Sequence, residues 1–224
     1  MKKKIFTSIG LMSGTSMDGV DLSVIKSDGY DEFTSIFNTY REFDKDLYKE
    51  LISIRNKISD AKDLKTYSND LDDVEKKFTL FNGKIISEVT QNIKEEIDLI
   101  GFHGQTIFHN SKDKISKQLG DGKLLSILMR KIVVNNFRKN DLNNGGQGAP
   151  LTPIFHNLIS RLIKYNFNIE FPISIINIGG ITNVTQIINC VNNLNQNFFA
   201  YDIAPGNCLM DEWVRKHTNL KYDK

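Results

Sequence analysis

The fold expected of this chain is decided by one stretch, Ile9-Gly10-Leu11-Met12-Ser13-Gly14-Thr15-Ser16-Met17-Asp18-Gly19-Val20-Asp21. Apolar, β-prone segments precede and follow it, and the polar, glycine-rich residues between them predict a β-hairpin with a long tip. Gly14 and Gly19 can adopt positive φ, which lets backbone N–H groups point inward together, while Thr15 and Ser16 add hydroxyl donors. Such a tip can hold an anion such as phosphate, although an ordinary hairpin loop would have the same composition.

Length and composition limit the class of protein. The 224 residues suffice for one large domain or one and a half ordinary ones, and 40% of them are hydrophobic. The 29 basic and 27 acidic residues leave a net charge of +2, which gives no electrostatic reason to expect a nucleic-acid or membrane partner. No stretch approaches a membrane span. The basic N-terminus is followed by an apolar run too short for a signal peptide, so export is not expected.

The cysteines and the only tryptophan are expected to be buried. Cys190 and Cys208 lie in apolar surroundings and are interpreted as thiols in a reducing compartment, with a disulfide or a metal site as the alternative. Trp213 is expected in the core.

Sequence periodicity predicts sheet strands and helices in the first half. Residues 33–40 read as a third strand, which makes the start of the sheet antiparallel. Residues 45–58 have a helical apolar face. A second helix is predicted from the heptad-like spacing of Leu64, Tyr67, Leu71, Val74, Phe78, Phe81 and Ile85. We expect this helix to pack on the sheet, and a coiled coil with a partner is the alternative.

A short apolar run at residues 97–102 suits a buried strand and ends in His103-Gly104-Gln105-Thr106. Proteins of the α/β class place ligands at the carboxyl ends of such strands. His103 and Gln105 can both donate and accept hydrogen bonds, as a sugar hydroxyl requires, although His103 could equally be a loop histidine with no ligand. His109 and His156 lack this setting and are expected to be structural.

A candidate acid–base group follows the next predicted strand, residues 132–137. This strand is expected to end in Arg138-Lys139-Asn140-Asp141, ahead of the glycine-dense stretch Asn143-Asn144-Gly145-Gly146-Gln147-Gly148-Ala149-Pro150. Position alone makes Asp141 a turn residue, and the glycines predict a hinge or crossover. Arg138 offers a planar fork of donors, and its charge would keep Asp141 ionised if the two lie close together.

The second half begins like the first. After a helix from Thr152-Pro153, strands at residues 172–178 and 181–188 are joined by Gly179-Gly180, which predicts a second hairpin. A strand at residues 198–203 and a helix from Cys208 follow. Strand, glycine turn and strand therefore open both halves, which is a weak internal repeat.

Four motifs together resemble the anhydro-N-acetylmuramic acid kinases of the sugar-kinase/actin-like superfamily. The first hairpin looks like their phosphate-1 loop, and Asn177-Ile178-Gly179-Gly180-Ile181-Thr182-Asn183 is similar to their second phosphate loop. The other two are Phe137-Arg138-Lys139-Asn140-Asp141, with the Gly145-Gly146-Gln147-Gly148-Ala149-Pro150-Leu151 that follows it, and Tyr201-Asp202-Ile203-Ala204-Pro205-Gly206-Asn207-Cys208-Leu209-Met210-Asp211.

The resemblance implies an α/β, actin-like (ribonuclease H-like) sugar-kinase fold, with a complete first domain at residues 1–145 and a partial second domain at residues 146–224. It also implies an ATP- and Mg²⁺-dependent kinase that opens 1,6-anhydro-N-acetylmuramic acid by hydrolysis and phosphorylates O6, giving N-acetylmuramic acid 6-phosphate. Such an enzyme would recycle cell-wall peptidoglycan in the cytoplasm and would usually form a homodimer.

The resemblance also implies a role for each site residue. Asp141 would be the catalytic base, and His103, Gln105 and Arg138 would bind the sugar. The nucleotide would be bound by Gly14, Thr15, Ser16, Met17, Asp18, Gly19, Val20, Asp21, Gly179, Gly180 and Thr182. No metal ligands are identified. Asp18 and Asp21 suit a phosphate site only with a divalent cation or a water between, and Asp202 could have a similar role.

The length of the chain leaves other functions open. A two-domain kinase of this kind should need roughly 300–400 residues, and nothing in this sequence matches the family's later adenosine-binding segment. The chain could belong to a longer or split kinase. It could be a non-catalytic remnant with weak sugar or phosphate binding. It could also be a hydrolase in which Asp141 activates water and no phosphate moves.

Overall fold

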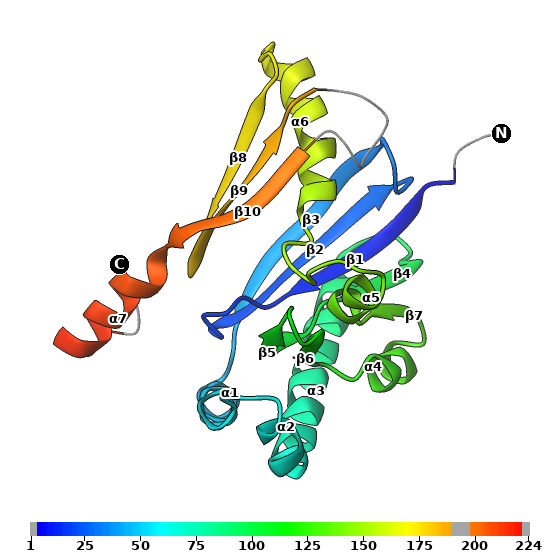
Figure 1. Cartoon of the computed structure of the whole chain (residues 1–224). Coiled ribbons are helices and arrows are strands. Elements are labelled where there is room, and N and C mark those ends of the chain that lie inside the picture. The colour runs from blue at the N-terminus through cyan, green and yellow to red at the C-terminus, as the bar shows by residue number, and fades with distance from the viewer. Residues whose placement is uncertain (1–3, 190–197, 221–224) are drawn as a thin grey trace. The chain divides into compact units, whose positions relative to one another are not determined.

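The computed structural model describes residues 4–189 and 198–220, which form two compact units (Figure 1). Unit 1 comprises Met1–Gly148 and unit 2 comprises Ala149–Lys224. Each unit is described by itself. In the described part of the chain, no helix combines the length and apolarity that crossing a bilayer requires.

A mixed five-stranded sheet forms the centre of unit 1, in the order β3-β2-β1-β4-β7. The first three strands, β1 (Phe6–Met12), β2 (Gly19–Ser27) and β3 (Phe33–Glu42), are antiparallel, as the sequence predicts. The others, β4 (Leu99–Phe102) and β7 (Ile132–Asn135), continue the sheet parallel to β1. Parallel strands connected through helices make this an α/β protein, and that prediction is confirmed.

One long helix supplies much of the core of unit 1. The predicted second helix is divided at Tyr67 into a short α2 (Asp63–Thr66) and α3 (Ser68–Asn92), and α1 (Lys45–Lys57) precedes them. The apolar stripe of α3 is buried at Leu71, Val74, Phe78 and Ile85, and the Phe78 ring stacks 6.0 Å from that of Phe102 in β4. The stripe therefore packs inside the chain itself, as expected for a helix that covers a sheet.

A small hairpin and two short helices complete unit 1. The hairpin strands β5 (Gln105–Asn110) and β6 (Ile115–Leu119) are antiparallel and lead into α4 (Gly122–Met129). The last helix, α5 (Phe137–Asn143), corrects one prediction, because the strand expected at residues 132–137 ends at Asn135. Asn136 adopts a left-handed conformation with φ of 58°, which asparagine tolerates well, and the chain turns there into the helix.

Unit 2 contains a three-stranded antiparallel sheet in the order β10-β9-β8. It begins with α6 (Pro153–Phe167), followed by β8 (Ile173–Ile178), β9 (Ile181–Ile187), β10 (Phe198–Pro205) and α7 (Asn207–His217). The predicted hairpin at Gly179-Gly180 is confirmed. The Nδ1 atom of His156 on α6 lies 2.7 Å from the hydroxyl of Thr185 in β9, which is consistent with the structural role expected of this histidine.

Several apolar side chains of unit 2 are exposed. They include Ile176 and Ile178 in β8, Phe199 and Tyr201 in β10, and Trp213 in α7. The prediction that Trp213 lies in the core is therefore wrong, because no residue of α7 is buried. Cys208, which was expected to be buried, is a free and exposed thiol, while Cys190 lies outside the described residues.

Candidate active site

The carboxyl ends of three parallel strands meet at one edge of the sheet of unit 1. Leu11 of β1 is paired with Phe102 of β4, and Phe102 with Asn135 of β7. The N–H of His103 donates to the carbonyl of Leu11 at 3.3 Å, which keeps the strand ends together. The β1–β2 tip, the His-Gly-Gln-Thr segment and α5 all start at this edge, where α/β proteins place their ligands.

The β1–β2 tip is a fixed loop with free donors. Met17 adopts a left-handed conformation with φ of 56°, its side chain is only 1% exposed, and its N–H donates to the Gly14 carbonyl at 3.2 Å. The Ser16 hydroxyl donates to Asp18 Oδ1 at 2.6 Å. Thr15 and Ser16 are exposed, and their backbone N–H groups find no acceptor among the residues that the structure describes. An anion can occupy such a position.

The other predicted nucleotide-binding residues of the tip have two kinds of setting. Met17, Gly19 and Val20 are buried, and a side chain at Gly19 would overlap the carbonyl oxygen of Arg41, so these three residues support the shape of the tip. Asp21 is exposed, and partial desolvation followed by the charge of Asp18 raises its carboxyl pKa.

Gln105 points into the protein, against the tip. It is 0% exposed, its Oε1 accepts a hydrogen bond from the Ser13 hydroxyl at 2.5 Å, and its Nε2 donates to the Gly14 carbonyl at 3.0 Å. The Ser13 hydroxyl also lies 2.8 Å from the Gly19 carbonyl. The amide of Gln105 is therefore engaged with the protein in this conformation.

His103 is held by its own loop. Its Nδ1 lies 2.8 Å from the Gly104 carbonyl and must donate to it, which leaves Nε2 to accept a hydrogen bond. Burial of the imidazole, and then the positive charge of Arg138, lower the pKa of His103 below its ordinary value. His103 is thus a neutral acceptor near Arg138, which is a chemistry that suits a sugar hydroxyl.

Asp141, Arg138 and Gly148 form a second cluster beside this edge. The N–H of Gly148 donates to Asp141 Oδ2 at 2.7 Å, and Arg138 Nη1 donates to the Gly148 carbonyl at 2.8 Å. The N–H and the carbonyl of Gly148 are thus both hydrogen-bonded to side chains of α5. Among the described residues no ion pair joins Arg138 to Asp141, so the expected direct stabilisation of the carboxylate by the arginine is not found. Burial lowers the pKa of Arg138, and its Nε has no partner in the described part of the chain.

The sequence alone did not connect His109 with this cluster. A Cβ atom at Gly148, which has φ of +75°, would lie 2.8 Å from His109 Cε1. Burial and the charge of Arg138 lower the pKa of His109, and its hydrogen bond to the backbone of Gln147 opposes that shift. His109 therefore packs against the loop that carries Gly148, and the structural role expected of it stays a prediction. No spacing rule links a strand residue to a loop so much later in the chain.

The stability of the protein should fall when the pH drops from about 7.5 to about 5.5. The pKa of His103 is lowered in the folded state, so the unfolded chain binds more protons below its ordinary value of 6.5. The stabilisation is fully present well above that value, begins to be lost near it, and continues to be lost as the pH falls through the lower pKa of the folded state. The urea midpoint measures the effect, and His103→Gln should reduce its pH dependence. If His103→Gln changes that dependence no more than His217→Gln, at an exposed position on α7, the assignment to His103 is wrong.

The second glycine hairpin belongs to unit 2. The carbonyls of Gly179 and Gly180 accept hydrogen bonds from Asn207 at 2.8 Å and from Gly206 at 2.9 Å. A side chain at Gly206 would overlap the Gly179 carbonyl and approach the Thr182 hydroxyl. The turn is thus fixed against the start of α7, and its binding of nucleotide remains a prediction.

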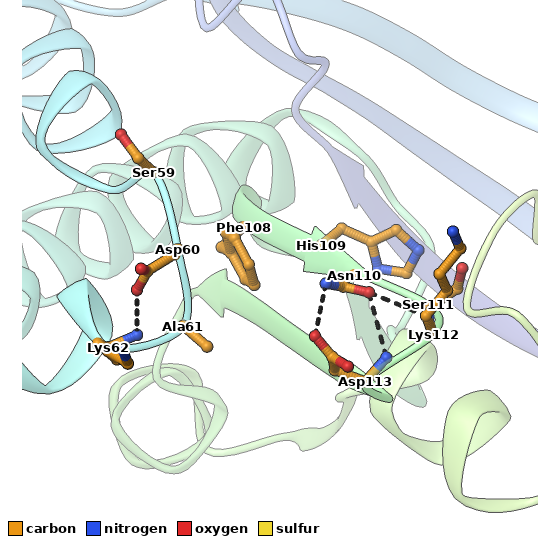
Figure 2. A pocket seen from close by; sticks show the side chains of 10 residues that line it. All are labelled: Ser59, Asp60, Ala61, Lys62, Phe108, His109, Asn110, Ser111, Lys112 and Asp113. Carbon is orange, nitrogen blue, oxygen red and sulfur yellow. Dashed lines mark hydrogen bonds between the residues drawn. The ribbon is translucent and has the colours of Figure 1, made fainter.

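A separate cavity of about 550 Å³ lies at the far end of the β5–β6 hairpin in unit 1. Figure 2 shows the α1–α2 connection, with Asp60 and Lys62, on one side and the β5–β6 turn, with Asn110 and Asp113, on the other. The residues that line it include His109 but neither Asp141 nor the tip. Within the described residues, no group of three or more His, Cys, Asp or Glu side chains is placed to hold a metal.

These features define an α/β protein with a candidate ligand site at the carboxyl ends of parallel strands. A family model for anhydro-N-acetylmuramic acid kinase matches residues 6–224. The anhydro-N-acetylmuramic acid kinase of Pelagibacter ubique is 54% identical over 222 residues, and that of Agrobacterium fabrum is 35% identical over 227 residues. Each match covers 99% of this chain. The chain belongs to the anhydro-N-acetylmuramic acid kinase family.

The chain is shorter than these relatives. It covers 57% of the Pelagibacter protein and 58% of the Agrobacterium protein. The kinase from Paramagnetospirillum magneticum is 34% identical over 221 residues and is covered to 56%.

Proposed function

We propose that this chain acts in the ATP-dependent opening and phosphorylation of 1,6-anhydro-N-acetylmuramic acid, which yields N-acetylmuramic acid 6-phosphate. The observation that carries the proposal is the pair of sites at one sheet edge of unit 1, a tip with free N–H groups and a carboxylate on α5. The reaction needs both, because one site must hold phosphates and the other must activate water.

Asp141 is the proposed general base. Its Oδ2 is held by the Gly148 N–H, and no donor among the described residues engages Oδ1, which is left to take a proton from the attacking water. As the water attacks the anomeric carbon, the bond from that carbon to the bridging oxygen breaks and frees O6. Arg138 would offset the charge that develops there, and His103 Nε2 would accept a hydrogen bond from a sugar hydroxyl.

The tip fits the phosphates of ATP through the N–H groups of Thr15 and Ser16, with Gly14 giving the backbone room for a close approach. ATP supplies the phosphoryl group that is transferred to O6. Two nearby carboxylates, Asp18 and Asp21, suit Mg²⁺, which keeps several waters and uses few protein ligands when it binds with phosphates.

The proposed architecture is an actin-like sugar kinase, and the strand order β3-β2-β1-β4-β7 supports it. In this proposal residues 1–145 form the first domain, and residues 146–224 begin a second domain whose Gly179, Gly180 and Thr182 bind nucleotide. Along the chain, the division between the two compact units falls between residues 148 and 149, close to that boundary. Peptidoglycan recycling in the cytoplasm and a homodimeric state are parts of the same proposal.

An assay on the whole chain separates the three functions. With ATP and 1,6-anhydro-N-acetylmuramic acid, we expect N-acetylmuramic acid 6-phosphate, identified by mass spectrometry. Unphosphorylated N-acetylmuramic acid formed without ATP would instead show a hydrolase. Saturable sugar binding by calorimetry with no product would show that this chain alone does not catalyse the reaction, and neither binding nor product would contradict the site.

A further inference from the structure

We propose that Gln105 is a positioning residue that sets the orientation of the Gly14–Thr15 peptide, and that it does not bind the sugar. This inference deepens the proposed function, because it concerns the tip that would hold the phosphates. It also changes the role that the sequence suggests for Gln105.

The first observation is that both ends of the Gln105 amide are engaged by the tip. The side chain is 0% exposed and comes from β5, far along the chain from the tip. Its Oε1 accepts from the Ser13 hydroxyl at 2.5 Å, and its Nε2 donates to the Gly14 carbonyl at 3.0 Å and to the Thr106 carbonyl at 3.4 Å. A sugar hydroxyl could reach this amide only after these hydrogen bonds break, which would leave buried polar groups unpaired.

The second observation concerns the direction of one peptide group. In a trans peptide the C=O and the following N–H point in opposite directions. Gln105 Nε2 and the Met17 N–H both hold the Gly14 carbonyl on the inner side of the tip. The N–H of Thr15 belongs to the same peptide and must therefore point away from them, where no described residue accepts it. The buried amide thereby directs a free donor towards the position of the anion.

Only an amide side chain meets these requirements at this position. The side chain must donate to the Gly14 carbonyl and accept from the Ser13 hydroxyl, and the N–H and oxygen of one amide group do both. Leucine has a similar volume but neither group, so Gln105→Leu would release the Gly14 carbonyl. Of the two hydrogen bonds that fix the Gly14–Thr15 peptide, only the one from the Met17 N–H would then remain, and the Thr15 N–H would no longer be held in one direction.

A variant on the neighbouring strand provides the matched control. Gln118 of β6 is also an amide of this hairpin, and it pairs with Thr106 and Ser116 without reaching the tip. In the full chain, Gln105→Leu should weaken ATP binding at least tenfold by calorimetry, with sugar affinity within twofold of wild type. Gln118→Leu should leave both affinities unchanged. If Gln105→Leu loses the sugar and keeps ATP, or if both variants lose both ligands equally, the inference is wrong.

A second measurement does not depend on the proposed function. Hydrogen exchange of the Met17 amide, read by nuclear magnetic resonance, reports its bond to the Gly14 carbonyl. We expect at least tenfold faster exchange in Gln105→Leu than in Gln118→Leu, with Ser13→Ala causing a similar and non-additive change. Equal exchange rates in the two glutamine variants would contradict the proposed positioning role of Gln105. If wild type binds no ATP but the exchange rates differ as expected, the positioning role of Gln105 is supported and the proposed function fails.

Discussion

Replacing Asp141 by asparagine should lower the rate of sugar opening and phosphorylation by about 10²- to 10⁴-fold, the usual contribution of a general base. Asparagine keeps an oxygen that can accept the Gly148 N–H, so the α5 cluster should remain folded. It cannot take a proton from water at neutral pH. The measurement is the turnover of 1,6-anhydro-N-acetylmuramic acid with ATP, together with circular dichroism to confirm an unchanged fold.

Asp113→Asn is the control for this experiment. Asp113 lies in the β5–β6 turn, where it accepts a hydrogen bond from Asn110, and among the described residues it makes no hydrogen bond to α5. Its replacement should leave turnover unchanged. If Asp141→Asn retains more than about a tenth of the wild-type rate, Asp141 is not the base.

The Gly104→Ala variant should be destabilised by about 2–5 kcal/mol, the sum of strain at positive φ and overpacking against a rigid group. Gly104 has φ of +78°, and a side chain there would overlap the carbonyl oxygen of Leu119 in β6. This oxygen belongs to the backbone and cannot move aside as a flexible side chain could. Urea unfolding of the whole chain, followed by circular dichroism, measures the loss.

Two other glycines separate the causes of that loss. Gly29 has φ of +80° and open space around it, so Gly29→Ala should cost only the strain, about 1–2 kcal/mol. Gly10 has neither positive φ nor a close neighbour, and Gly10→Ala should have little effect. Equal losses at Gly104 and Gly29 would show that the backbone of β6 yields to the added side chain.

Local patterns in the sequence were sufficient for most of the fold. The glycine turns at Gly14 and at Gly179-Gly180 predict both hairpins, because turn chemistry depends on adjacent residues. The apolar stripe of α3 predicts a buried helix, because its period repeats over many turns. The position of His103 was also predictable, because the apolar run at residues 97–102 predicts a buried strand and His103 comes directly after it.

The errors arose where distant residues decide the structure. The short α5 gives too few turns for a periodic signal, so Arg138 and Asp141 were expected at a strand end. The burial of Gln105 depends on Ser13 and Gly14, far away in the sequence. Trp213 was expected inside on the basis of residue type alone, and residue type does not reveal that α7 has no buried face.

The buried side chain of Met17 has an energetic consequence for whatever binds at the exposed end of the β1–β2 loop. Because this residue is part of the core, the loop loses its conformational entropy when the protein folds. The loop is therefore already ordered before an anion binds, and binding carries little further entropic cost for ordering the chain. Substitutions deep in the core around Met17 should therefore weaken ligand binding without touching the ligand.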